Sequence, residues 1–289
     1  MSQEVQLEYN QKNPVALIEG ILREVDIAPS DLDSQIRDRL VLLADQTETV
    51  TDEISAIRRA DDVFRVAERR GHAYSSDEKH IVRVGTLLTD IGKTGPPEAS
   101  MEQAQLFVDI YALENLPTEV LMDSLNSFFM VYFPQRAESF KAVFDSLGID
   151  CAISLREFYD LHTEWTLKLL INAAGIPREP IAGAVSHHRM RDDNPDGIFD
   201  EGSDVYNQKY NFGENSAYDR AEKLINILDI YDALCRRSGL SHIVAMSTLR
   251  EIAKHASGGR YAQDPEILEI LDDLDATASL SEQLELEAG

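Results

Sequence analysis

The sequence predicts an all-α fold. Apolar residues recur at helical spacing through most of the 289 residues, and runs that alternate with a period of two are scarce. Hydrophobic residues make up 43% and charged residues 27%, as in an ordinary folded chain that can bury a sizeable core. The two cysteines, Cys151 and Cys235, show no metal or redox spacing. We therefore expect one or two helical domains in a reducing compartment.

Helix signals follow one another through the first half of the chain. Asn13 before Pro14 is typical of a helix start, and Ser30 is placed to cap the next helix. Gly71 and Gly92 mark helix ends. After the two helices that start at Pro14 and Ser30, we expect helices at about 48–70, 76–90, 99–114, 117–132 and 135–147.

The second half continues the helical pattern around one long interruption. Ser154 opens a helix that runs to Gly175, and Pro177 starts the next one. Residues 191–216 are rich in Asp, Asn, Gly and Tyr and predict a long loop, a feature that is usually functional or disordered. Helices return at about 217–238, 244–257 and 265–274.

These elements predict a helical bundle with an addition at each end. Residues 1–50 are expected to form an N-terminal helical extension, and residues 51–275 the main domain. A helical insertion at about 99–147 and the loop at about 191–216 belong to that domain, and residues 276–289 form an acidic tail.

The charge of the chain excludes two classes of partner. The 27 Lys and Arg residues against 52 Asp and Glu residues give a net charge of −25. A nucleic-acid binder needs a basic face, and docking on anionic lipid needs one as well. The sequence also shows no apolar leader and no apolar run of membrane-spanning length, so we expect a cytoplasmic protein without nucleic-acid or membrane partners.

His187 and His188 are adjacent at the end of an apolar helix and the start of the long polar loop. A helix end that faces a loop is a natural place for metal ligands. The alternative is a solvated helix end, where a protonated imidazole is favoured by the helix dipole.

Asp90 is expected in the last turn of the helix that Gly92 ends, among apolar neighbours. A carboxylate in that place opposes the helix dipole, and partial burial makes it costly unless a cation is near. The cation is a metal ion or, in the alternative interpretation, the side chain of Lys93 three residues later, with backbone N–H groups contributing.

Three further residues are candidates for the same site. His162 lies on an amphipathic helix, where the alternative is a histidine satisfied near the core. Asp229 and Asp232 share one face of an otherwise apolar helix, where the alternative is ion pairing with Arg236 or Arg237. Histidine nitrogens together with carboxylates suit Mn, Fe or Zn, and such a site can activate water and clamp a phosphate.

Five segments resemble, in the same order, the HD superfamily of metal-dependent phosphohydrolases, and within it the HD-GYP branch. The resemblance extends from about Asp62 to Leu274. The segments are residues 85–97 (the His-Asp doublet region), the position of His162, residues 184–188 (the double histidine), residues 221–234 (the last aspartate) and residues 257–268.

The chain departs from the family pattern at several positions. Thr89 stands where the doublet has a histidine, and Asp62 stands where the first ligand histidine is expected. Arg189 replaces the glutamate after the double histidine, and the Gly-Tyr-Pro signature is absent from the loop.

The resemblance implies a site for one or two divalent metal ions, Mn, Fe or Zn. Asp90, His162, His187 and His188 would hold one ion, and Asp229, with Asp62, would hold a weaker second ion. The implied activity is hydrolysis of a phosphoester, in a nucleotide or a cyclic dinucleotide, with Asp90 and Lys93 as the catalytic residues. The alternative is a non-catalytic HD-like signalling or scaffold protein, with or without metal, that binds a nucleotide or contacts a protein partner through the insertion.

Overall fold

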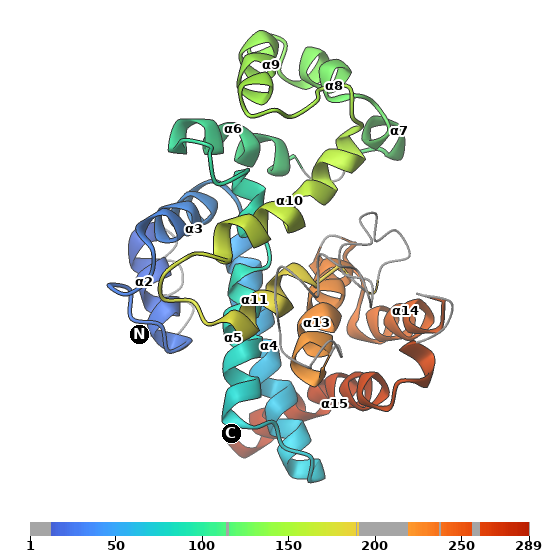
Figure 1. The fold of residues 1–289 in the computed structure, drawn as a ribbon. Coiled ribbons are helices and arrows are strands. Elements are labelled where there is room, and N and C mark those ends of the chain that lie inside the picture. The colour runs from blue at the N-terminus through green and yellow to red at the C-terminus, as the bar shows by residue number, and fades with distance from the viewer. Residues whose placement is uncertain are drawn as a thin grey trace. The chain divides into compact units, whose positions relative to one another are not determined.

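The structure, a computed structural model, describes residues 13–113, 116–188, 190, 219–236, 238–255 and 261–288. Every regular element in these residues is a helix, which confirms the all-α prediction (Figure 1). The described chain has no strand, and its isolated backbone bridge joins Ser124 and Ser154. Within the same residues, no helix combines the length and the apolar character that crossing a membrane requires.

The chain divides into two compact units. Unit 1 comprises residues up to Val50 together with Asp90–Ile176, and unit 2 comprises Thr51–Thr89 together with the chain from Pro177 onward. The predicted end of the N-terminal extension at residue 50 coincides with the first passage from unit 1 to unit 2.

Unit 1 begins with two helices whose starts test the predicted caps. Asn13 caps α2 (Pro14–Glu24) as expected, because its side chain accepts a hydrogen bond from the Ala16 N–H at 3.1 Å. The prediction for Ser30 is wrong: α3 (Ser34–Gln46) begins after Asp33, whose Oδ1 accepts from the Gln35 N–H at 2.8 Å. The remaining helices of unit 1 are η1 (Ile91–Thr94), α6 (Met101–Tyr111), α7 (Thr118–Leu121), α8 (Leu125–Tyr132), α9 (Ala137–Ser146) and α10 (Leu155–Leu170).

An aromatic core fills the part of unit 1 formed by α6–α10. The rings of Phe107 and Phe144 stack with centroids 4.9 Å apart, and Trp165 meets Phe107 edge-on. The single helix expected at 117–132 is two helices, α7 and α8. It breaks there because Ser124 caps α8 and the adjoining backbone pairs with the start of α10, from the Leu155 N–H to the Asp123 carbonyl at 2.9 Å.

Arg39 fixes the N-terminal helices to the segment that follows η1. Its guanidinium is fully buried and donates to the carbonyls of Thr94, Pro96 and Ala99, each at 2.9 Å. Burial lowers the pKa of Arg39 to about 10, against the raising effect of Glu98, so the group remains charged at neutral pH. A buried charge is tolerated when both terminal nitrogens of the guanidinium are hydrogen-bonded in this way, and α3 is therefore an integral part of unit 1.

Unit 2 is built around α5 (Ser76–Leu88), which packs against α11 (Arg178–Val185) and α13 (Arg220–Arg236). Gly85 on α5 permits this close packing, since a Cβ there would lie 2.6 Å from the Ile225 side chain and 3.1 Å from the Pro180 carbonyl. The other helices of the unit are α4 (Thr49–Arg70), α14 (His242–His255), η3 (Tyr261–Gln263) and α15 (Pro265–Ala288).

Two expectations concern the acidic tail and the long loop of unit 2. The helix α15 continues through the residues expected to form an acidic tail, up to Ala288. The long loop predicted at about 191–216 lies outside the described residues.

Candidate metal centre

Asp90 lies just beyond a helix rather than inside one. The helix α5 ends at Leu88, Thr89 is its C-cap, and Asp90 precedes the short helix η1. The expectation that Asp90 sits in the last helical turn is therefore wrong by about half a turn. Past Leu88 the Thr89 hydroxyl bonds back to the Thr86 carbonyl at 2.9 Å, and the chain then turns into η1.

Gly92 lets η1 approach α10 more closely than any other residue would. Its N–H donates to the Thr166 hydroxyl at 3.0 Å. A Cβ at this position would lie 1.9 Å from the His162 carbonyl oxygen and 2.6 Å from the Thr166 nitrogen. The glycine thus positions Asp90 and Lys93 beside the face of α10 that carries His162.

The Asp90 carboxylate lies between a lysine and a histidine. The Lys93 ammonium is 2.5 Å from Oδ2, and His162 Nε2 is 3.4 Å from Oδ1. The ion pair with Lys93, which the sequence offered as the alternative to a metal ion, is therefore present. It neutralises one carboxylate oxygen and leaves the other directed toward the imidazole.

His162 is buried on α10 and its ring orientation is fixed. Nδ1 lies 2.5 Å from the Tyr159 carbonyl oxygen, and Tyr111 meets the ring edge-on at 6.1 Å. A carbonyl can only accept, so His162 Nδ1 carries a proton and donates it to the Tyr159 carbonyl. Burial, with the nearby charge of Asp90 among others, raises the pKa of Tyr111 well above its ordinary value, so this phenol stays neutral.

His187 and His188 follow α11 in unit 2, and both are buried, with 0% and 7% of their surface exposed. The solvated helix end that the sequence allowed for them is therefore wrong. Their ring centroids are 4.2 Å apart, and His187 Nδ1 lies 2.6 Å from the Ala184 carbonyl oxygen. The Asn226 amide donates to the Ser186 carbonyl at 2.9 Å and fixes this end of α11 to α13.

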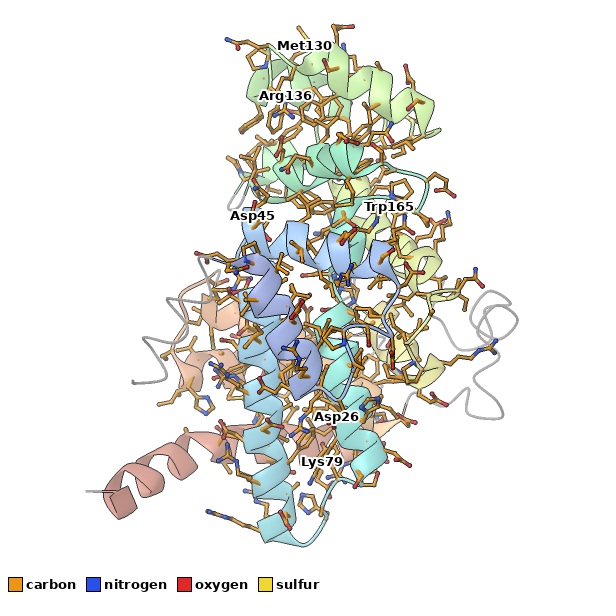
Figure 2. All side chains as sticks on the ribbon, turned by 90° about the vertical axis from the view of Figure 1, so that its left-hand side faces the viewer. Asp26, Asp45, Lys79, Met130, Arg136 and Trp165 are labelled. Atoms are coloured by element: carbon orange, nitrogen blue, oxygen red, sulfur yellow. The ribbon has the colours of Figure 1, made fainter. Side chains whose placement is uncertain are left out.

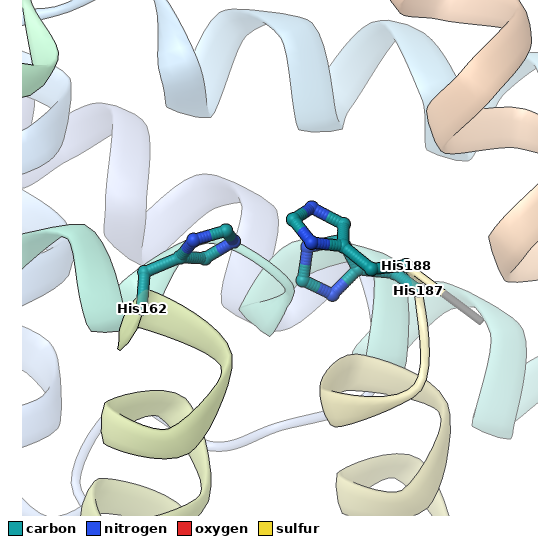
Figure 3. Close-up of side chains that lie close together, drawn as sticks. All are labelled: His162, His187 and His188. Carbon is teal, nitrogen blue, oxygen red and sulfur yellow. The ribbon is translucent and has the colours of Figure 1, made fainter. Parts of the chain in front are cut away.

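The histidines and Asp90 fit a metal ion in three respects. The side chains drawn in Figure 3, His162 of unit 1 and His187 and His188 of unit 2, are buried imidazoles of the kind that transition metals bind. In both His162 and His187 a backbone carbonyl binds Nδ1, the contact that usually orients a ligating histidine and leaves Nε2 for the ion. Two ligands of a tetrahedral ion lie about 3.4 Å apart, which matches the separation of Asp90 Oδ1 and His162 Nε2 of 3.4 Å.

Asp232 behaves as the alternative interpretation predicted. Its carboxylate lies 3.5 Å from Arg236 Nε on the same helix, and Arg236 also pairs with Asp52 of α4 at 2.7 Å. Burial raises the pKa of Asp232, and the charge of Asp229 adds to this, although Arg236 and Arg59 act in the opposite direction. Asp229 is half-buried on α13, and its role as a ligand stays a prediction.

Asp62 has a partner of its own, because Arg65 on the same helix pairs with it at 2.5 Å. Its role as a second-ion ligand also stays a prediction. The residue missed by sequence reasoning is Glu53, which is buried on α4 with Oε1 3.4 Å from the Thr89 hydroxyl. The local signal for it is weak, namely that Glu53 shares the helical spacing of the core residues Val50 and Ile57.

The chain has no match among known protein families, curated proteins or solved structures.

Proposed function

We propose that this chain is a metal-dependent phosphohydrolase that cleaves a phosphodiester of a nucleotide or cyclic dinucleotide. The proposed ligands are Asp90 and His162 of unit 1 with His187 and His188 of unit 2, and they would hold Mn, Fe or Zn. The observation that carries the proposal is the orientation of the buried imidazoles, since His162 and His187 both have Nδ1 at a backbone carbonyl.

The proposal gives each residue a task. A divalent ion held by Asp90, His162, His187 and His188 would supply a charge that polarises the phosphoryl oxygen and activates a water molecule to displace the leaving oxygen at phosphorus. Lys93 faces the same carboxylate as the proposed ion and would stabilise negative charge on the phosphoryl oxygens. Because Lys93 already binds Asp90 Oδ2, we infer one strongly held ion at Asp90 rather than two bridged by it.

The first experiment is metal analysis of tag-free protein by plasma mass spectrometry. We expect about one equivalent of Mn, Fe or Zn per wild-type chain, lost in His187→Ala and in His162→Ala. The matched control is His255→Ala, because His255 is a surface histidine that is 75% exposed in its side chain and should keep the metal. Wild-type protein with no metal, even after reconstitution, would refute the proposal.

Hydrolysis is then measured on bis(p-nitrophenyl) phosphate and on a panel of cyclic dinucleotides. We expect metal-dependent turnover that falls by about a hundredfold or more in Lys93→Met with the metal retained, because Lys93 is proposed to act on charge rather than as a ligand. If the protein is fully loaded with metal and hydrolyses no phosphodiester, the proposed hydrolase activity is refuted and the alternative, non-catalytic function is favoured.

That alternative is a non-catalytic HD-like protein that binds a nucleotide or a protein partner. Two observations favour it. The Asp90 carboxylate is already neutralised by Lys93, and Thr89 provides a hydroxyl bonded to a backbone carbonyl where the family has a ligand histidine.

A further inference from the structure

Side chains bond to three of the backbone carbonyls at the end of α11. The Ser186 hydroxyl lies 3.4 Å from the Gly183 carbonyl oxygen, and His187 Nδ1 lies 2.6 Å from that of Ala184. The Ser186 carbonyl itself accepts from Asn226 Nδ2 of α13 at 2.9 Å. Carbonyls at a helix end have no partner within the helix, so such bonds decide how the chain leaves it. Ser186 and Asn226 are both 0% exposed, and solvent therefore cannot replace the amide.

The bond from Asn226 holds the peptide group that leads into His187. The Ser186 carbonyl and the His187 nitrogen belong to one planar peptide, so a hydrogen bond to the carbonyl oxygen fixes the whole plane. If this plane turned, φ of His187 would change and its imidazole would leave the Ala184 carbonyl. The ring centroid of His188 is 4.2 Å from that of His187, so the same peptide orients both histidines.

Asn226 is a polar residue in apolar surroundings. Carbon-rich side chains fill the spaces between packed helices (Figure 2), and Ile225 and Ile227 on either side of Asn226 in the sequence are buried. The helices α11 and α13 are in close contact here, since a Cβ on Gly183 would lie 2.3 Å from Ile225 Cδ1. The Ser186 carbonyl can only accept, so the amide presents Nδ2 to it, and Oδ1 has no hydrogen-bond partner among the described residues.

The buried amide has a cost that helix packing does not explain. An unpartnered buried acceptor costs free energy, so packing alone would favour an apolar residue at position 226. Natural sequences break such local rules mainly at functional sites. The bond that the amide does make orders the backbone directly before two of the proposed metal ligands.

We propose that Asn226 is a positioning residue for His187 and His188. It acts through the Ser186 peptide rather than as a ligand. The inference rests on the proposed function, and it assigns the orientation of two of the four ligands to a residue of α13. Removal of groups that orient metal-ligating side chains typically weakens metal binding by about 10–100-fold.

The first test measures the Zn²⁺ affinity of the tag-free full chain by competition with a chromophoric chelator. We expect Asn226→Ala to bind Zn²⁺ at least about tenfold more weakly than the wild type. The matched control is Ile225→Val, which shortens the side chain packed against Gly183 and leaves the Asn226 amide in place. It should lower the melting temperature and keep the wild-type affinity, because it loosens only the helix contact. Wild-type affinity in Asn226→Ala, or equal weakening in both variants, would overturn the proposal.

The second test needs no metal and uses NMR of the imidazole N–H groups in the metal-free chain. The wild type and Ile225→Val should show a slowly exchanging His187 Nδ1–H signal, assigned by its absence from His187→Ala. Asn226→Ala should lose this signal, because the ring is no longer held at the Ala184 carbonyl. Absence of the signal from the wild type, or its persistence in Asn226→Ala, would overturn the proposal.

The two tests separate the two possible failures. A wild type that binds no Zn²⁺, Mn²⁺ or Fe²⁺ refutes the proposed function, and the NMR signal still decides whether Asn226 orders His187. Asn226→Ser, whose side chain is too short to reach the Ser186 carbonyl, repeats both tests if Asn226→Ala does not fold.

Discussion

At the scale of single residues, the candidate site depends on a glycine as much as on its ligands. Gly92 has no side chain to separate η1 from α10, where a Cβ would lie 1.9 Å from the His162 carbonyl oxygen. The clash is with helix backbone, which cannot yield as the end of a flexible side chain can. The relative placement of Asp90 and His162 in unit 1 follows from this contact.

We expect Gly92→Ala to lower the free energy of unfolding by about 2–4 kcal/mol, because η1 must move away from α10. Urea denaturation measures the change. Gly20→Ala is the matched control: Gly20 lies inside α2 with nothing within 4 Å of an added Cβ. The same substitution should there stabilise the chain by about 0.5–1 kcal/mol, since alanine favours a helix over glycine. Equal effects at the two positions would contradict this account.

Sequence reasoning singled out the histidines and Asp90, whose roles as ligands stay predictions, but it did not single out Glu53 or Arg39. The histidines are rare enough for their spacing to carry information, whereas one charged residue among the chain's 79 Lys, Arg, Asp and Glu residues (27 plus 52) does not stand out. The role of Arg39 depends on carbonyl groups 55 to 60 residues later in the chain. Contacts at that separation are set by tertiary packing, which local patterns do not encode.

At the scale of elements, α10 begins with a capping box. This cap fixes the start of the helix that carries His162. The Ser154 hydroxyl accepts from the Glu157 N–H at 3.2 Å, and the Glu157 carboxylate accepts from the Ser154 N–H at 2.7 Å. The sequence predicted this start correctly from Ser154. It did not predict the break between α7 and α8, because that break depends on backbone pairing with residues 153–155.

The capping box gives α10 a pH dependence. Hydrogen bonds from the Ser154 backbone and hydroxyl lower the pKa of Glu157. A carboxyl whose pKa is lower in the folded chain stabilises it above the ordinary pKa of glutamate and loses this effect as the pH falls through the folded value. We therefore expect the wild type to have a higher melting temperature than the Glu157→Gln variant at neutral pH. The difference in melting temperature should shrink toward pH 3.

Thermal denaturation by circular dichroism across this range provides the measurement. Ser154→Ala, which removes the hydroxyl cap, should cost about 1 kcal/mol. A difference between wild type and Glu157→Gln that stays constant with pH would show that the carboxylate charge does not stabilise α10.

At the scale of the whole molecule, net charge is the dominant electrostatic feature. A charge of −25 creates self-repulsion that favours the expanded chain. Sodium chloride screens this repulsion, with a Debye length of about 10 Å at 0.1 M and about 3 Å at 1 M. We expect the melting temperature to rise by several degrees over this range in calorimetry. A melting temperature that falls with salt would contradict the expectation.

The division into two units could not be predicted from local sequence patterns, although most of the helices that compose the units were predicted. Helical periodicity is local, whereas membership of a unit depends on which distant segments pack together. The N-terminal extension over residues 1–50 stays a prediction, and nothing local in the sequence shows that Arg39 binds the segment after η1.

The interleaved order of the two units has a consequence for synthesis of the chain. Unit 1 draws on residues up to Val50 and on Asp90–Ile176, so it cannot close until most of the second stretch has left the ribosome. Unit 2 is completed still later, because α5 packs on α11 and α13 and the buried side of α4 packs in the same core as α13, and both α11 and α13 follow Pro177. Neither unit can complete itself while the nascent chain is short. The protein therefore most needs a chaperone while only its early helices have been made, because their apolar faces are still uncovered.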